Sequence, residues 1–324
     1  MRDAVVVIGS GMMGSGIAAM SALGGRRTIL FNRSEKNLER GLERAKDCIR
    51  LREDNELDTP EESAQALRLL EGSTDLRDAL SQAFFAEEAI TEDLPLKQQL
   101  FREVDQLLPP EYPICSTTSG LRITDIARGC LHPERTVTTH FWLPPHLIPL
   151  VEVVIGEHTK HALAEQVRNE LRRWKKTPVL VERDLPGQLL GRIFQAILRE
   201  SIDIVASGLA TAEDVDTAIA KGIGMRLAQW GPLQHLDAIG LTLALSVQDS
   251  VLPDLCADRQ GNPYLRELVS SGKLGAETGQ GFYDWSTRNL EQDIQRRNQF
   301  IIAALKAVKQ IGEAPAEIPA ETLK

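Results

Sequence analysis

The stretch at residues 5–16, VVVIGSGMMGSG, constrains the fold more than any other. It opens with four branched apolar residues, the pattern of a strand buried on both faces. Gly9, Gly11 and Gly14 follow with GxGxxG spacing, which permits a tight turn, close approach of a pyrophosphate and close packing of the next helix. A helix beginning near Gly11 directs unpaired N–H groups toward an anion. The stretch therefore predicts a dinucleotide-binding turn.

The flanking residues decide the interpretation, because glycine-rich turns are common. A helix of small residues follows, Gly24 and Gly25 end it, and residues 28–31 predict a second apolar strand. This order is the start of a Rossmann-type unit. The residues expected to bind the cofactor in the turn are Gly9, Gly11, Met12, Met13 and Gly14.

Asn32 and Arg33 stand where such a fold selects its dinucleotide. An acidic residue here would bind the ribose hydroxyls of NAD, whereas an arginine can accept the 2′-phosphate of NADP. We therefore expect both residues to contact the cofactor and leave NAD and NADP open. A capping role for Ser34 beside a solvated Arg33 is an equally simple interpretation.

Strands and helices alternate through the first half of the chain. Further strands are expected at 84–90, 113–116, 137–140, 150–154 and 178–182. The pattern predicts an α/β domain of the Rossmann type at residues 1–184.

The rest of the chain reads as helical. Residues 188–207 are apolar nearly all round, which predicts a central buried helix. We expect an all-α domain at 185–312 and a disordered tail at 313–324.

Composition limits the partners and the compartment. The chain has 324 residues, a net charge of −9, and four cysteines without CxxC spacing. The acidic balance disfavours nucleic acid and anionic membrane as partners, and the cysteines suit a reducing compartment. A strand from about Ala4 leaves no room for a signal peptide, and no apolar run reaches membrane-spanning length. We expect a cytoplasmic protein with a small-molecule substrate.

His140 and Glu152 are the first candidates for chemistry. They lie in successive expected strands, so a connector that folds back would let the carboxylate orient the imidazole as a proton-transferring base. A structural core histidine remains open on these residues alone. A metal site is disfavoured because His140 and His146 lack a third ligand, and no metal is expected. The loop at 117–120 follows a strand end, where ligands bind in open α/β sheets, although a simple turn is equally open.

The chain resembles the 3-hydroxyacyl-CoA dehydrogenases over nearly its whole length. The motifs that carry the resemblance, in family order, are GSGMMG at 9–14, TEDL at 91–94, TSG at 118–120, HFxxP at 140–144, PLVEV at 149–153, DVDT at 214–217 and TGQGFY at 278–283. The resemblance implies NAD as the usual cofactor. It also implies catalysis between the two domains and a homodimer formed through the helical domain.

The resemblance also implies roles for single residues. His140 would remove the hydroxyl proton while hydride passes to the nicotinamide, with Glu152 as its partner and Ser119 bonded to the substrate oxygen. Glu92 and Lys97 match family residues near the nicotinamide and are expected to bind the cofactor.

Two departures from the family pattern affect substrate binding. Gly191 stands where the family's PGFxxNR motif has asparagine, and Leu143 replaces the asparagine of the histidine motif. Gln188, or a water, could replace the missing amide contacts to the substrate.

Residues 144–149, 222–226 and 230–232 are similar to the branch that contains L-gulonate 3-dehydrogenase, lambda-crystallin and dehydrogenases of small carboxylated alcohols. In that branch Arg226 would hold a substrate carboxylate, although a solvated arginine at a helix end is also open. Residues 46–56, where the acyl-CoA enzymes offer lysines to CoA phosphates, carry little net positive charge.

The expected activity is hydride transfer between NAD(P) and the secondary alcohol or ketone of a 3-hydroxy acid or related carboxylated alcohol, with His140 as general acid/base. The first alternative is a 3-hydroxyacyl-CoA dehydrogenase acting on thioesters. The second is a dinucleotide-binding structural or regulatory protein that has lost catalysis.

Overall fold

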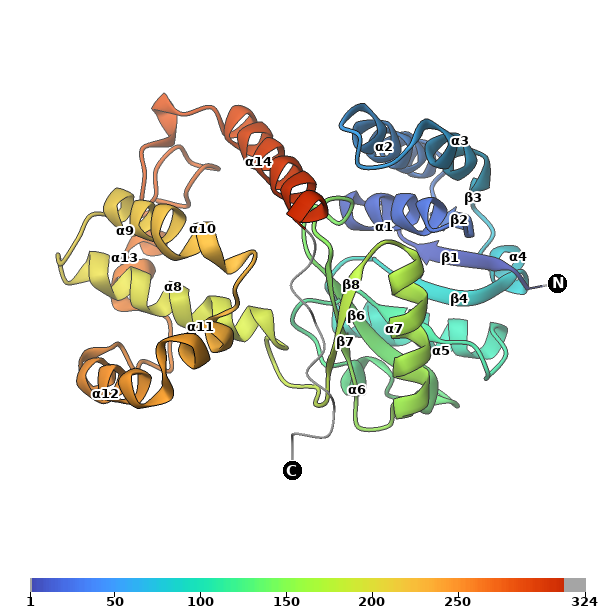
Figure 1. Cartoon of the computed structure of the whole chain (residues 1–324). Coiled ribbons are helices and arrows are strands. Elements are labelled where there is room, and N and C mark those ends of the chain that lie inside the picture. The colour runs from blue at the N-terminus through green and yellow to red at the C-terminus, as the bar shows by residue number, and fades with distance from the viewer. Residues whose placement is uncertain (1, 312–324) are drawn as a thin grey trace. The chain divides into compact units, whose positions relative to one another are not determined.

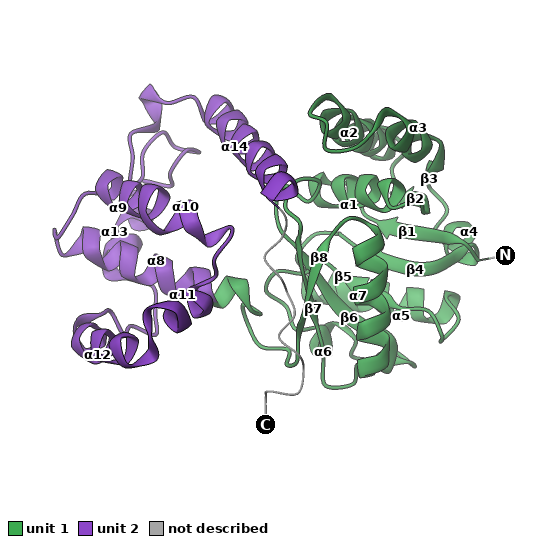
Figure 2. Ribbon diagram, viewed as in Figure 1, with its two compact units in different colours: residues 1–192 green, residues 193–324 purple. Residues whose placement is uncertain are grey.

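The computed structural model of the chain describes residues 2–311. The chain divides into two compact units, Met1–Arg192 and Ile193–Lys324, shown in green and purple in Figure 2. The sequence-based boundary was placed after residue 184. The expected tail at 313–324 lies outside the described residues.

Unit 1 contains one eight-stranded sheet with the order β3-β2-β1-β4-β5-β6-β7-β8. The strands are β1 (Ala4–Ile8), β2 (Arg27–Phe31), β3 (Leu70–Ser73), β4 (Ala83–Glu88), β5 (Ile114–Ser116), β6 (Thr136–Phe141), β7 (Leu150–Val154) and β8 (Thr177–Val181). All neighbouring pairs are parallel except β6 and β7. The edge strand β3 was not predicted, because its four residues, LEGS, are half exposed and carry no strand pattern.

Helices cover both faces of this sheet (Figure 1). They are α1 (Met12–Leu23), α2 (Glu35–Asp54), α3 (Pro60–Leu69), α4 (Leu76–Ser81), α5 (Leu94–Leu107), α6 (Ile123–Ile126) and α7 (His161–Arg173). Val5 and Val7 of β1 pack in one apolar core with α1, α2, α3 and α7, whereas Ala4, Val6 and Ile8 pack in the other with α4, α5 and α6. The all-buried β1 and this three-layer arrangement confirm the Rossmann-type prediction.

Unit 2 is helical, as predicted. Its described helices are α8 (Leu190–Ala206), which begins in unit 1, α9 (Ala212–Ala218), α10 (Gly224–Leu227), α11 (Pro232–Ile239), α12 (Leu241–Val251), α13 (Pro263–Ser270) and α14 (Leu290–Ile311). The predicted burial of α8 is wrong: none of its residues is buried, and Ile193 and Phe194 are 48% and 47% exposed. An all-round apolar helix needs cover on every side, which the described part of the chain does not supply. None of the described helices is long and apolar enough to span a membrane.

Glu87 of β4 is a fully buried carboxyl group at the centre of the sheet. The hydroxyl of Thr139 on β6 lies 2.6 and 2.8 Å from its two oxygens. Burial raises the pKa of Glu87 well above its ordinary value, and the smaller opposing effects of Thr139 and Lys97 do not cancel this. The folded chain therefore keeps Glu87 protonated at pH values where the unfolded chain releases the proton.

We expect Glu87→Gln to flatten the pH dependence of stability, because the amide imitates the neutral acid. In the parent protein Glu87 makes its full contribution to the free energy of unfolding below its unfolded-state pKa of about 4.3. This contribution is lost as the pH rises through its folded-state pKa. Urea unfolding should show the variant more stable by about 1–3 kcal/mol at pH 8 but not at pH 4. Glu71→Gln is the control: Glu71 is half exposed and a hydrogen bond from Arg27 lowers its pKa, so its effect should be small and opposite in sign. Parallel pH profiles for the parent and Glu87→Gln would contradict the prediction.

Candidate active site

The glycine turn between β1 and α1 has the geometry that a dinucleotide requires. Gly9 has φ +116°, and a Cβ there would lie 2.5 Å from the Ala89 carbonyl oxygen. A Cβ on Gly14 would lie 1.8 Å from the Gly9 carbonyl oxygen, so only glycine permits this close packing. At Gly11, which precedes α1, a Cβ would meet no atom within 4 Å, and no side chain caps the helix. The turn thus leaves both space and unpaired N–H groups for a phosphate.

A cavity of about 300 Å³ adjoins this turn and is suited to the adenosine end of a dinucleotide. Its lining includes Gly9, Gly11, Asn32 and Arg33. The Asn32 amide donates to Ser10 Oγ at 2.9 Å and accepts from the Ser34 N–H at 2.9 Å, so its orientation is fixed. Arg33 is exposed and forms no ion pair with another described residue. The residues present therefore fit a dinucleotide and place an unpaired cation at the rim.

His140 and Glu152 form a direct pair in the antiparallel part of the sheet. Their Cα atoms are register partners on β6 and β7, and His140 Nδ1 lies 2.6 Å from Glu152 Oε2. The other ring nitrogen of His140, Nε2, lies 3.1 Å from Ser119 Oγ. Because an ionised carboxylate can only accept, Nδ1 carries the proton and Nε2 presents its lone pair toward Ser119.

Glu152 is buried and accepts four hydrogen bonds. Besides His140, the donors are the Trp142 indole at 3.0 Å and the backbone N–H groups of Leu189 and Leu190 at 2.9 and 2.8 Å. Burial raises the pKa of Glu152, but the four donors together outweigh burial and leave this pKa below its ordinary value. Glu152 is therefore a carboxylate at neutral pH and can stabilise a protonated His140.

Glu92 fixes the loop that carries Ser119. One of its carboxylate oxygens accepts from the Thr118 hydroxyl at 2.6 Å and from the N–H groups of Ser119 and Gly120 at 3.1 and 3.0 Å. Burial raises the pKa of Glu92, and the Thr118 and Gly120 hydrogen bonds, with the charge of Lys97, lower it further than burial raises it. Glu92 therefore holds the backbone at Ser119 and Gly120 in place.

Lys97 of α5 lies beneath this loop, and only 1% of it is exposed. Its ammonium bonds to Glu88 at 2.6 Å and lies 3.3 Å from Glu92. Glu88 also accepts from the Ser116 hydroxyl at 2.6 Å. The expected role of Lys97 in binding the cofactor stays a prediction. Among the described residues its ion pairs position Glu88 and Glu92.

Gln188, Gly191 and Leu143 are the residues at or near the positions where the family has asparagine. Gln188, which is buried and has φ +51°, donates from Nε2 to the Thr118 carbonyl at 3.1 Å, and its Oε1 has no protein partner. A Cβ on Gly191 would meet no atom within 4 Å. Leu143 is 48% exposed. An amide oxygen therefore lies beside the Ser119 loop, while the two family positions present open space and an apolar side chain.

Arg226 lies in α10 of unit 2. It is exposed, and its guanidinium forms no hydrogen bond or ion pair with another described residue. His146 contacts Cys48 Sγ at 3.3 Å, and burial with the nearby Lys176 and Arg52 lowers the pKa of His146 to about 4. It is therefore uncharged at neutral pH.

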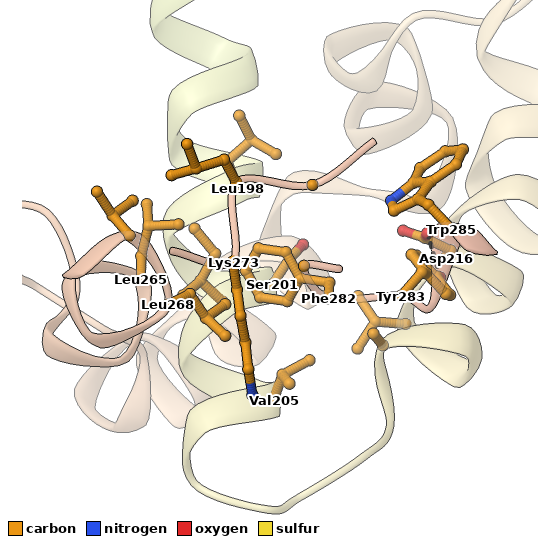
Figure 3. Close-up of a pocket in the computed structure, with 17 residues that line it drawn as sticks. Leu198, Ser201, Val205, Asp216, Leu265, Leu268, Lys273, Phe282, Tyr283 and Trp285 are labelled. Carbon is orange, nitrogen blue, oxygen red and sulfur yellow. Dashed lines mark hydrogen bonds between the residues drawn. The ribbon is translucent and has the colours of Figure 1, made fainter. Parts of the chain in front are cut away.

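Unit 2 also contains an apolar cavity of about 430 Å³ (Figure 3). Side chains of α8, α9 and α13 line it together with residues 273–285. The Tyr283 hydroxyl donates to Asp216 at 2.6 Å, and burial with this hydrogen bond raises the pKa of Tyr283 to about 12. None of the predicted site residues lines this cavity.

Sequence reasoning missed Trp142, Leu189 and Leu190 as partners of Glu152. The two leucines act through backbone N–H groups, which any residue would supply, so no sequence signal could have identified them. Trp142 had one available signal, because alternate residues of a strand share a face and Trp142 follows His140 by two.

Two family descriptions match the chain. They are "3-hydroxyacyl-CoA dehydrogenase, NAD binding domain" over residues 4–185 and "3-hydroxyacyl-CoA dehydrogenase, C-terminal domain" over residues 187–285. Together they cover most of the described residues.

Similar proteins support the same match. The 5-formyl-3-hydroxy-2-methylpyridine 4-carboxylate 5-dehydrogenase of Mesorhizobium japonicum is 31% identical over 296 residues, which are 90% of this chain and 95% of that protein. A probable 3-hydroxybutyryl-CoA dehydrogenase of Bacillus subtilis is 32% identical over 286 residues, 88% of this chain and 98% of that protein. The crystal structure of a 5-formyl-3-hydroxy-2-methylpyridine 4-carboxylic acid 5-dehydrogenase, described as an NAD⁺ dependent dismutase, gives a TM-score of 0.87 at 29% identity and covers 97% of this chain and 100% of that one.

Proposed function

Because the chain belongs to the 3-hydroxyacyl-CoA dehydrogenase family and is an NAD-dependent oxidoreductase, we propose that it interconverts the alcohol and carbonyl forms of a small carboxylated hydroxy compound. The observation that carries the proposal is the His140–Glu152 pair, in which His140 Nε2 lies 3.1 Å from Ser119 Oγ. This arrangement is a proton acceptor beside a hydroxyl donor. It suits the oxidation of an alcohol.

In the proposed mechanism, the substrate hydroxyl binds between Ser119 Oγ and His140 Nε2. His140 takes the hydroxyl proton, and Glu152 stabilises the resulting imidazolium through Nδ1. The bound dinucleotide supplies the hydride acceptor. In the reverse direction His140 returns the proton to the carbonyl oxygen, while the Ser119 hydroxyl donates to the same oxygen.

A similar enzyme and the charges of residues 46–56 support the proposed substrate class. The Mesorhizobium enzyme acts, by its name, on a pyridine carboxylate, which is a small carboxylated compound. The cations of residues 46–56 are already neutralised: Lys46 and Arg50 pair with Glu43, and Arg52 forms a buried ion pair with Asp58. This segment therefore offers little to CoA phosphates, which supports a free acid. We propose the unpaired Arg226 as the carboxylate anchor and Gln188 Oε1 as a further substrate contact.

The acyl-CoA alternative is favoured by the Bacillus relative, whose name specifies a CoA thioester. Steady-state comparison of acetoacetyl-CoA with free 3-hydroxy acids and hydroxymethyl or formyl aromatic carboxylates separates the two. We expect higher kcat/KM for the free acids and a loss of about tenfold or more with Arg226→Ala. A strong preference for the thioester would reject the proposed substrate class.

For the cofactor, we propose that NADP is used alongside NAD, because Asn32 is neutral and Arg33 is unpaired. Arg33→Ala is then expected to lower the ratio of kcat/KM with NADP to that with NAD by about 10- to 100-fold, the value of one charge-assisted hydrogen bond. Arg40→Ala, on the exposed surface of α2 and outside the cavity lining, is the control. An unchanged ratio in Arg33→Ala would show that this arginine does not bind the 2′-phosphate of NADP.

We also propose that the active protein is a homodimer formed through unit 2. This unit leaves Leu233, Leu241 and Phe300 between 63% and 75% exposed, and α8 has no buried residue. Contiguous exposed apolar patches mark protein interfaces, and a second copy of unit 2 would cover these side chains. Sedimentation equilibrium is expected to give twice the chain mass, and a monomer at micromolar concentration would contradict the proposal.

A further inference from the structure

Trp142 contacts both members of the catalytic pair. Its indole N–H donates to Glu152 Oε2 at 3.0 Å, the same oxygen that accepts from His140 Nδ1 at 2.6 Å. Its ring lies beside the imidazole, with centroids 5.1 Å apart and an interplanar angle of 55°. One side chain therefore packs on the imidazole and shares its carboxylate.

The four donors divide the Glu152 carboxylate into two halves. Oε1 accepts from the backbone N–H groups of Leu189 and Leu190, which any sequence would provide. Oε2 accepts from His140 and Trp142, and the second of these donors depends on the residue type. Oε2, the oxygen that bonds to His140, is thus also the oxygen whose negative charge the Trp142 indole can reduce.

We propose that Trp142 is a positioning residue that holds the His140 ring in place and limits how strongly Glu152 stabilises its protonated form. The inference rests on the proposed function, in which His140 must be unprotonated to accept the hydroxyl proton. An indole donor on Oε2 neutralises part of the charge that the imidazolium would otherwise receive. The negative charge that Glu152 presents to the imidazolium is therefore smaller than it would be without the indole.

Other ionisable groups do not replace this effect. Those of the elements packed around the pair include Glu88 of β4, which shares a sheet face with His140, Glu92 and Lys97 beside the Ser119 loop, and Asp184 and Arg192 around the 185–190 segment. None of them hydrogen-bonds to His140, Glu152 or Trp142 among the described residues. The indole ring itself acts in the opposite sense, because an aromatic face favours a nearby cation. A test must therefore remove the N–H and keep a ring, as Trp142→Phe does.

The first experiment needs no turnover. A protonated imidazole quenches an adjacent indole, so the emission of Trp142, taken as the parent protein minus Trp142→Phe, should fall in one step as the pH is lowered. The step should be absent in His140→Gln. A difference emission without a step, or a step that persists in His140→Gln, overturns the proposed contact. If the step is present but no alcohol is oxidised, the proposed function fails and the contact stands.

The second experiment is the pH profile of kcat/KM for alcohol oxidation. In Trp142→Phe the acid limb is expected to move to higher pH by about 0.5–1 unit, with the plateau at high pH little changed. Trp174→Phe is the matched control, because the Trp174 indole donates to Glu170 at 3.0 Å in the same unit, in the buried core. It should lower stability and leave the acid limb in place. An acid limb that stays in place in Trp142→Phe, or moves equally in both variants, overturns the proposal.

Discussion

Replacing His140 by alanine is expected to lower kcat/KM for alcohol oxidation by about 10²- to 10⁴-fold, the usual contribution of a general base. The imidazole is the only group for which the structure provides both an orienting carboxylate and a lone pair directed at Ser119, within the described residues of unit 1. Its removal leaves the substrate proton without an acceptor. The glycine turn and its cavity do not include His140, so dinucleotide affinity should be nearly unchanged.

The matched control for this experiment is His132→Ala. His132 also stands beside a glutamate, with Nδ1 3.4 Å from Glu134, but its side chain is 41% exposed and outside the site. We expect parental kinetics from His132→Ala. Retention of parental kcat/KM in His140→Ala, with dinucleotide binding intact, would remove His140 from the mechanism.

Glu152→Gln is expected to reduce kcat/KM by about 10³-fold. The substitution removes the carboxylate charge beside His140, and it also changes which ring nitrogen of His140 carries the proton. The glutamine oxygen can still accept from the N–H groups of Leu189 and Leu190. The glutamine NH₂ group, itself a donor, then faces two other donors, His140 Nδ1 and the Trp142 indole. The imidazole can then only accept at Nδ1, so its proton moves to Nε2. Nε2 is the atom that must receive the substrate proton.

The same substitution should change stability in a defined pH window. Because the pKa of Glu152 is lowered in the folded state, its contribution is present above the unfolded pKa of about 4.3 and is lost as the pH falls through the folded pKa. Urea unfolding should therefore show Glu152→Gln as destabilised at pH 7, with the difference shrinking below pH 4. Glu134→Gln, at a partly exposed glutamate, is the control for both measurements. Full activity in Glu152→Gln would mean that the carboxylate only supports the fold.

Much of unit 1 could be predicted because its signals are local. The run of branched residues in β1 and the three glycines require a buried strand and a close turn, and both are observed. The juxtaposition of His140 and Glu152 was also within reach, since two strands joined by a short connector pair as neighbours. These features depend on residue type and spacing, which the sequence contains.

Features that depend on distant packing could not be predicted. The apolar surface of α8 indicates that something must cover it but not what, so its burial was wrongly assigned to this chain. The burial of Lys97 follows from the positions of Glu88 and Glu92, which the folding of several elements decides together. The four donors on Glu152 include two backbone groups that leave no trace in the sequence.

The antiparallel pairing of β6 with β7 separates what can vary in this enzyme from what cannot. Register alone brings His140 opposite Glu152, and a slip of one residue would turn one of them to the other face of the sheet. Backbone groups make this strand pairing, and residues 143–149 only join the two strands. In evolutionary terms, a lineage that keeps this register inherits the proton-transfer pair, whatever substrate the residues around it bind.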